Sequence, residues 1–240
     1  MNEYGCLAHF DHFLFDDIGF AKKNGFSFLQ IWYDKNGISL KKESDPLESL
    51  LKIEFPTVIH AVLDINDFDE HVPKLKTIMD KLGHKEIIIH PVCKTEIIEN
   101  ETIEKLNGKI KFALEVLSNK KIFLENNSKI DPIFNTVEDI KYIFVNNPNL
   151  EFILDIAHID NLVHLTEMIS IKKPGYFHLA DKRLNVIHEH LPVGEGNIDF
   201  DKIFSEIIIW NGLKIIFEIV QGENELVKSK TIIEKIIKNN

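Results

Sequence analysis

LEFILDIAH (residues 150–158) joins a run of apolar residues to two polar side chains, Asp155 and His158. The apolar run has the length and composition of a strand that is buried on both faces, as strands are in a parallel sheet. A carboxylate or imidazole buried at the end of such a strand costs several kcal/mol unless it is paired or bound to a metal. The segment therefore predicts a buried strand that ends at a functional site.

Five other apolar runs follow the same design, because each places a His or Glu near its C-terminal end. One such residue would be uninformative. Six at equivalent strand ends, counting Asp155, indicate a single site at one face of a barrel. The five runs are TVIHAV (57–62) with His60, EIIIHPV (86–92) with His90, KIFLEN (121–126) with Glu125, GYFHLAD (175–181) with His178 and LKIIFEIV (213–220) with Glu218.

Strands and helices are expected to alternate along the whole chain. Two more strands are predicted near residues 4–10 and 26–32, and the strand ends recur about every 30 residues, the length of one βα unit. No glycine-rich fingerprint follows the first strand, so an open nucleotide-binding sheet is not favoured. We therefore expect an α/β fold with a single (βα)8 TIM barrel domain over residues 1–240. The predicted helices are 13–24, 45–54, 68–83, 96–118, 137–147, 160–171, 199–211 and 223–238.

The composition limits the class of protein. The 240 residues are 44% hydrophobic, which is enough for one large core. The formal net charge of −10 argues against a general nucleic-acid binder, which neutralises phosphates with Lys and Arg. Cys6 and Cys93 form no CxxC pair, which is typical of a reduced, cytoplasmic setting. We expect no membrane association, since there is neither a signal peptide nor an apolar run long enough to span a bilayer.

The polar residues at the strand ends are of the types that hold metals. Imidazole nitrogen and carboxylate oxygen together suit zinc, manganese, iron or cobalt. Asp155 and His158 form a D-x-x-H step, and a long irregular segment, 180–197, carries His188 and His190 as H-x-H. We therefore predict at least one divalent metal, zinc or manganese.

Five motifs in this order carry a family resemblance that covers nearly the whole chain. As a set they resemble the xylose-isomerase-like barrel superfamily (AP endonuclease family 2), which includes sugar isomerases and epimerases, inosose dehydratases and apurinic endonucleases of the endonuclease IV type. The resemblance does not fix the substrate, because one fold hosts many functions. The motifs are LEN (124–126), LDIAH (154–158), HLAD (178–181), HLPVGEGNIDF (190–200) and FEIV (217–220).

The isomerase branch of this superfamily implies one divalent metal, held here by Glu125, Asp155, His178 and Glu218. The two glutamates would shuttle a proton at the carbon beside a carbonyl, and His158 would support the site. This is the leading prediction: a metal-dependent isomerase or epimerase that acts on a small sugar, polyol or sugar phosphate.

The endonuclease branch implies three zinc ions and is the alternative prediction, with DNA as the partner. His188 departs from that pattern, in which an aspartate stands at its position. The loop LDINDFDE (63–70) is acidic and Arg183 is the only arginine, so the DNA-inserting residues of that branch look absent. The implied ligand sets are His60, His90 and Glu125; Glu125, Asp155, His178 and Glu218; and His158, His188 and His190.

Four residues are candidates for substrate contact. His9 ends the first strand, where it could line the pocket, and the face of Trp32 could pack on a sugar, although core packing is the plainer interpretation. Lys182 and Arg183 follow HLAD directly and could hold a substrate phosphate, or could simply belong to a solvated loop.

Three further expectations concern the chain as a whole. A barrel that only binds a metabolite, without turnover, is a third alternative. Barrels of this superfamily often pair, so a homodimer is possible, although no interface can be identified from the sequence. His71, His84 and His164 are assigned to predicted helices and are expected to be solvated.

Overall fold

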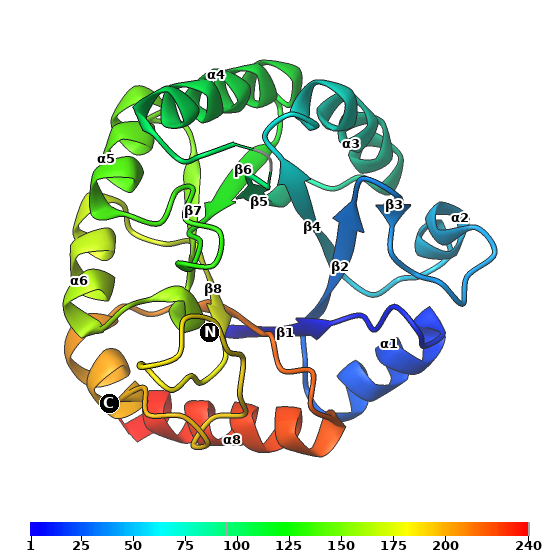
Figure 1. The fold of residues 1–240 in the computed structure, drawn as a ribbon. Helices are drawn as coiled ribbons and strands as arrows, with labels where there is room; N and C mark the ends of the chain where they lie inside the picture. The colour runs from blue at the N-terminus through cyan, green and yellow to red at the C-terminus, as the bar shows by residue number, and fades with distance from the viewer. Residues whose placement is uncertain (95, 240) are drawn as a thin grey trace.

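A computed structural model describes residues 1–94 and 96–239 as a closed parallel barrel surrounded by helices (Figure 1). Strand β1 pairs in parallel with both β2 and β9, which closes the sheet and confirms the predicted TIM barrel. A two-residue strand, β3 (Gly37–Ile38), only extends β2 as a hairpin. The barrel strands are β1 (Glu3–Leu7), β2 (Phe28–Asp34), β4 (Thr57–Asp64), β5 (Glu86–Val92), β6 (Lys121–Glu125), β7 (Glu151–Asp155), β8 (Tyr176–Leu179) and β9 (Lys214–Phe217).

The helices follow the strands in the predicted order. The expected helix 199–211 is the one clear difference, because it begins as a short α-helix and continues as a π-helical turn over Ile203–Ile207. The α-helices are α1 (Leu14–Lys23), α2 (Pro46–Leu51), α3 (Phe68–Leu82), α4 (Asn100–Val116), α5 (Val137–Asn146), α6 (Leu162–Ile171), α7 (Phe200–Lys202) and α8 (Glu223–Asn239).

Two apolar clusters divide the interior. The larger lies between the strands and the helices, and the smaller fills the inside of the barrel. The smaller cluster blocks the barrel axis, so the polar residues at the C-terminal strand ends stand above an apolar floor. Its buried members are Phe28, Val58, Ile88, Phe123, Ile153, Tyr176 and Ile216.

The strand register brings the polar residues together. Asp155 is the direct partner of His178 across β7 and β8, and the backbone N–H of Glu218 donates to the carbonyl of Leu179 at 3.1 Å. After β7 the chain turns through one 3-10 turn, Ile156–His158, which places His158 beside the same site. We call this end of the barrel the C-terminal mouth.

The expectation that the histidines assigned to helices are solvated was wrong for His71 and His164. His84, in the loop before β5, is half-buried with its Nε2 2.9 Å from the hydroxyl of Thr57. His71 and His164 lie on the inner faces of their helices, where each finds a buried polar partner. Nδ1 of His71 lies 2.8 Å from the hydroxyl of Tyr33, and Nε2 of His164 lies 3.1 Å from the carbonyl of Asn135. An amphipathic pattern cannot distinguish such satisfied imidazoles from solvated ones.

Over residues 1–94 and 96–239, none of the helices combines the length and the apolar character that crossing a membrane requires.

Candidate active site

Glu125 is the centre of the C-terminal mouth. It ends β6, is completely buried, and has imidazoles on both of its oxygens. Nδ1 of His178 and Nδ1 of His90 lie 3.1 and 3.2 Å from Oε1, and Nε2 of His60 lies 2.8 Å from Oε2. Burial opposes ionisation, but these neighbouring histidines outweigh it and hold the pKa of Glu125 well below its usual range. The group is a carboxylate at neutral pH.

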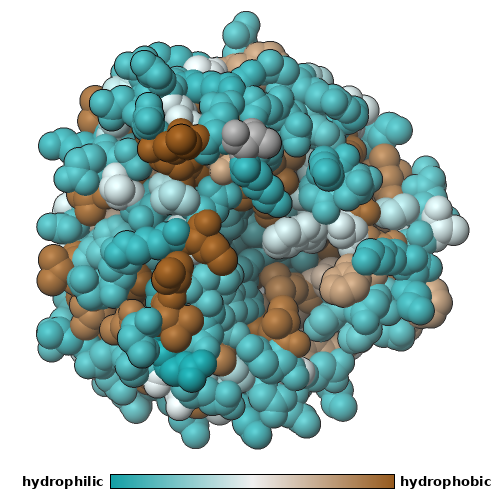
Figure 2. Space-filling model, viewed as in Figure 1, coloured by the Kyte–Doolittle hydropathy of each residue, from teal (hydrophilic) through white to brown (hydrophobic). Residues whose placement is uncertain are grey.

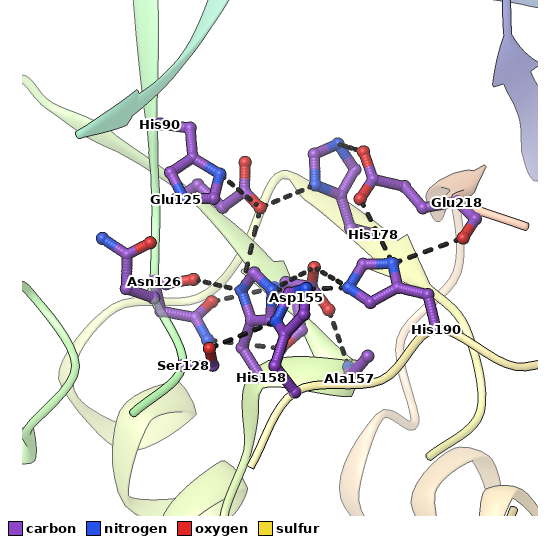
Figure 3. Close-up of polar contacts among 12 residues, drawn as sticks. His90, Glu125, Asn126, Ser128, Asp155, Ala157, His158, His178, His190 and Glu218 are labelled. Carbon is purple, nitrogen blue, oxygen red and sulfur yellow. Dashed lines mark hydrogen bonds and ion pairs between the residues drawn. The ribbon is translucent and has the colours of Figure 1, made fainter. Parts of the chain in front are cut away.

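Three more predicted ligands surround Glu125 (Figure 3). Oδ1 of Asp155 accepts the backbone N–H of Ala157 at 2.6 Å, and burial raises the pKa of Asp155 to about 6. Burial disfavours a charged imidazole, but the carboxylates of Glu125 and Glu218 outweigh this effect and raise the pKa of His178 to about 9. Glu125, Asp155, His178 and Glu218 each offer one ligand atom within 4.8 Å of the others.

Several buried polar atoms in the mouth lack a hydrogen bond of good geometry, although Nε2 of His60 and Nδ1 of His178 lie 2.8 and 3.1 Å from the oxygens of Glu125. Within the described part of the chain these are Nε2 of His60, both carboxylate oxygens of Glu125, Oδ2 of Asp155 and Nδ1 of His178. An orphaned buried polar atom costs about 1–3 kcal/mol, and more when it is charged. Most of these atoms are acceptors, so a divalent cation would satisfy them together. The residues present therefore fit a metal of the zinc or manganese type.

Gln30, on β2, fixes which nitrogen of two histidines carries a proton. Its Nε2 donates to Oε1 of Glu218 at 2.7 Å, which orients the amide, because a carboxylate can only accept. Its Oε1 then accepts from Nε2 of His178 at 2.7 Å, so Nδ1, beside Glu125, is the nitrogen of His178 that would give up its proton to a metal ion. The same amide nitrogen lies 3.0 Å from Nδ1 of His60, so His60 accepts there and carries its proton on Nε2.

A second group of histidines lies beside this carboxylate set. Nδ1 of His158 lies 2.8 Å from the carbonyl of Asn126, and Nδ1 of His190 lies 3.3 Å from the carbonyl of Glu218. Because a carbonyl can only accept, both rings carry a proton on Nδ1. Their Nε2 atoms face each other at 3.4 Å, a separation that needs a proton or a metal ion between two lone pairs. His188 joins them, with its ring centre 5.0 Å from that of His190.

Each histidine has one ring nitrogen that could bind a metal and a second one that makes a hydrogen bond. The partner of that second nitrogen divides the histidines into two kinds. A metal-binding imidazole usually donates its other N–H to a carbonyl or another oxygen acceptor. His178, His158 and His190 meet this condition. His60 does not, because its other nitrogen faces the amide donor of Gln30. This distinction favours the group of His158, His188 and His190 over the group of His60, His90 and Glu125 as a second metal site.

A buried carboxylate, Asp181, organises the long loop that carries His188 and His190. It accepts the backbone N–H groups of Gly194 at 2.8 Å, Gly196 at 3.0 Å and Ile198 at 3.2 Å. A Cβ at Gly196 would stand 2.3 Å from Oδ1 of Asp181, so only glycine allows this approach. The GEG motif is therefore structural: it folds the loop so that His190 reaches the mouth.

The predicted substrate residues lie in different surroundings. Trp32 is 40% exposed and its ring centre lies 5.2 Å from that of His60, at the border of the mouth. His9 lies at the C-terminal end of β1 with its Nδ1 on Asp17. Lys182 is buried, and its Nζ donates to the carbonyl of Ile159 at 2.8 Å.

In the same view as Figure 1, Figure 2 shows hydrophilic surface continuing into a central hollow, with hydrophobic side chains beside it.

Arg183 is exposed and its guanidinium is paired with the carboxylate of Glu189. The structure therefore brings the predicted ligands together, but it places Lys182 against the connection between β7 and α6 and pairs Arg183 within its own loop.

Gln30, Asn126 and Asp181 have roles that the sequence did not predict. Gln30 interrupts the apolar run FLQIW (28–32), which is a signal of the same kind as the six strand-end residues. Asn126 and Asp181 lie inside motifs, but their function is to hold other residues. Asn126 Oδ1 accepts the backbone N–H of Asp155 at 2.8 Å and so fixes the end of β7.

Comparison with known proteins places this geometry in context. Residues 68–236 match the family model described as xylose isomerase-like TIM barrel. No curated protein matches the chain in sequence.

Solved structures share the fold over nearly the whole chain. A D-allulose 3-epimerase from Methylomonas sp. is 18% identical with a TM-score of 0.73, covering 98% of this chain and 96% of that one. Endonuclease IV from Thermus thermophilus is 16% identical with a TM-score of 0.71, covering 99% and 100%. An IOLI protein with a bound zinc atom is 16% identical with a TM-score of 0.74, covering 99% and 98%. At these identities the likeness concerns the fold.

Proposed function

The chain belongs to the xylose isomerase-like TIM barrel family, and from this membership and the mouth we propose a metal-dependent isomerase or epimerase of small sugars, polyols or sugar phosphates. One observation carries the proposal: two glutamates, Glu125 and Glu218, approach His178 from opposite ring nitrogens, at 3.1 and 3.5 Å. Two carboxylates on either side of one ligand set are the arrangement that moves a proton between two positions of a bound substrate.

The two glutamates have the protonation state that this reaction needs. Burial raises the pKa of Glu218, but the imidazoles of His178, His60 and His190 together outweigh this effect, so the pKa lies lower than usual, as it does for Glu125. Each is therefore a base at neutral pH. One takes a proton from the carbon beside a substrate carbonyl, and the proton returns to the opposite face in an epimerase, or to the adjacent carbon in an isomerase.

The ligand set for the metal would be Glu125, Asp155, His178 and Glu218. A divalent metal bound there would polarise the carbonyl and make the neighbouring C–H more acidic. Gln30 holds Glu218 and His178 in place by hydrogen bonds of 2.7 Å each. The floor of the smaller apolar cluster keeps water from reaching the site through the barrel.

The test is exchange of a substrate hydrogen with solvent. We expect the zinc- or manganese-loaded protein to incorporate deuterium from D2O beside the carbonyl of at least one ketose or ketose phosphate, as observed by NMR. The variant Glu218→Gln should abolish the exchange, and the matched control Glu86→Gln, at the other end of the barrel, should retain it. Exchange that persists in both Glu125→Gln and Glu218→Gln would refute the proposal.

A zinc phosphodiesterase of the endonuclease IV type is a second candidate function. The converging Nε2 atoms of His158 and His190 favour it, because several clustered metals serve phosphodiester cleavage. The pairing of Arg183 with Glu189 and the acidic segment 63–70 oppose DNA binding.

This second candidate has its own test. Incision of a duplex with an abasic site, lost in His90→Ala and His158→Ala, would establish it. Inactivity of the zinc-saturated protein on that duplex would exclude it.

A further inference from the structure

A third histidine group lies outside the ligand sets of the mouth, on the loop that joins β1 to α1. Nδ1 of His9 and Nδ1 of His12 lie 2.9 and 3.1 Å from the same oxygen, Oδ1 of Asp17. The two rings face each other, with centres 4.4 Å apart and planes 36° apart. The group shares no residue with the ligand sets of the central site.

The carboxylate of Asp17 is fixed in place. Asp17 lies in the first turns of α1 with only 3% of its side chain exposed, and its second oxygen accepts the backbone N–H of His9 at 2.8 Å. The first oxygen therefore points at the two imidazoles whatever they bind. Because the loop from His9 to Asp17 is closed by these contacts, the three ligand atoms are preorganised.

We propose that His9, His12 and Asp17 form a further divalent-metal site, of the zinc, cobalt or nickel class, at the rim of the barrel and separate from the mouth. Two imidazoles and one carboxylate are a common ligand set for these ions. Their ligand atoms lie within 4.8 Å of one another, and the ion would replace the two N–H protons that now face Oδ1 of Asp17.

The exposure of the group leaves room for further ligands. The side chains of His9 and His12 are 24% and 41% exposed, so water or a substrate oxygen can complete the coordination. The competing interpretation is a structural clamp, in which both imidazoles only donate hydrogen bonds to Asp17. The two interpretations differ in one measurable respect, the number of metal ions that the chain holds.

The experiment is zinc stoichiometry by elemental mass spectrometry on the full chain, stripped with chelator, dialysed against zinc sulfate and then freed of unbound metal. We expect His12→Ala and Asp17→Asn each to hold one zinc ion fewer per chain than the wild type. His84→Ala, which removes an imidazole before β5 at the opposite end of the barrel, should keep the wild-type count.

An equal zinc count in the wild type and His12→Ala would overturn the proposal and leave the clamp. Circular dichroism checks the fold of each variant. If His12→Ala unfolds, the count for Asp17→Asn decides, and movement of the His9 and His12 ring nitrogen signals on zinc addition to the wild type gives a second readout. A failure of catalysis at the central site would not alter this count.

Discussion

A glutamate stands at each end of the barrel, and the two glutamates have different surroundings. At the N-terminal end the carboxylate of Glu86 accepts the hydroxyl of Tyr176 at 2.6 Å and the ammonium of Lys214 at 3.0 Å, and Lys214 also lies 3.1 Å from that hydroxyl. At the C-terminal mouth, the two buried oxygens of Glu125 face the imidazoles of His60, His90 and His178 without a hydrogen bond of good geometry.

Concavity alone does not distinguish the two ends. A cavity of about 510 Å³ opens at the N-terminal end, lined in part by Glu86, Tyr176 and Lys214. The carboxylate of Glu86 is paired there, which is typical of a stabilising contact. The orphaned atoms at the mouth cost stability in the metal-free protein, which is typical of a site that is completed by a ligand.

The largest expected effect separates the two ends by activity. Glu125→Gln removes a carboxylate that is both base and ligand, and we expect turnover of a verified substrate to fall by about 10³-fold or more. Glu86→Gln makes the same chemical change at the other end and should leave turnover unchanged. Steady-state kinetics on both variants checks this, and equal losses would remove the distinction between the ends.

The next effect concerns pH and the metal-free protein. The pKa of His178 is raised from 6.5 to about 9, so the folded state keeps a proton that the unfolded chain loses. The resulting stabilisation is full below pH 6.5 and is lost as pH rises through about 9, by up to about 3 kcal/mol. Chemical denaturation of chelator-treated protein at several pH values measures it.

The metal-loaded protein supplies the control for this pH effect. Protons compete with the metal for its ligands, so its stability should rise over the same pH range. A metal-free protein whose stability also rises from pH 6.5 to 9 would contradict the assigned surroundings of His178.

A smaller effect is expected on metal affinity when the hydrogen bonds that Gln30 makes to His178 and Glu218 are removed. Gln30→Leu removes the acceptor for Nε2 of His178 and the donor to Glu218, and we expect metal affinity to fall by about 10–100-fold. Trp32→Phe, on the same strand, should retain the affinity. Competition with a fluorescent chelator measures both variants, and unchanged binding by Gln30→Leu would show that the amide does not support the site.

The smallest expected effect lies at the paired end. Tyr176→Phe deletes one hydrogen bond to Glu86 and should lower the free energy of unfolding by about 1 kcal/mol, without any change in turnover. Urea denaturation and kinetics on the same preparation check both parts. A loss of activity would mean that the N-terminal end takes part in function.

The same comparison explains what could be predicted from the sequence. The strands and their terminal polar residues, such as Glu125 and His178, stand out because apolar runs end at them. The pairing of Glu86 with Tyr176 and Lys214 joins residues far apart in sequence that ordinarily lie at a surface, and no local pattern marks it.

The roles within the mouth were harder to predict. All nine predicted ligand positions converge, but nothing in the sequence indicates that Gln30 donates to His60 and accepts from His178. The two roles depend on which atom of the Gln30 amide faces which imidazole. That arrangement exists only once β2 has paired with β1 and β4. The burial of Lys182 likewise depends on how the loop 180–197 folds back around Asp181.

The most direct test of the metal centre is anomalous X-ray diffraction from crystals grown with zinc or manganese. We predict an anomalous peak among Glu125, Asp155, His178 and Glu218, with Nδ1 of His178 bound to the ion. A peak held by His60 and His90 without His178, or no peak in the mouth at full metal occupancy of the solution, would contradict the account.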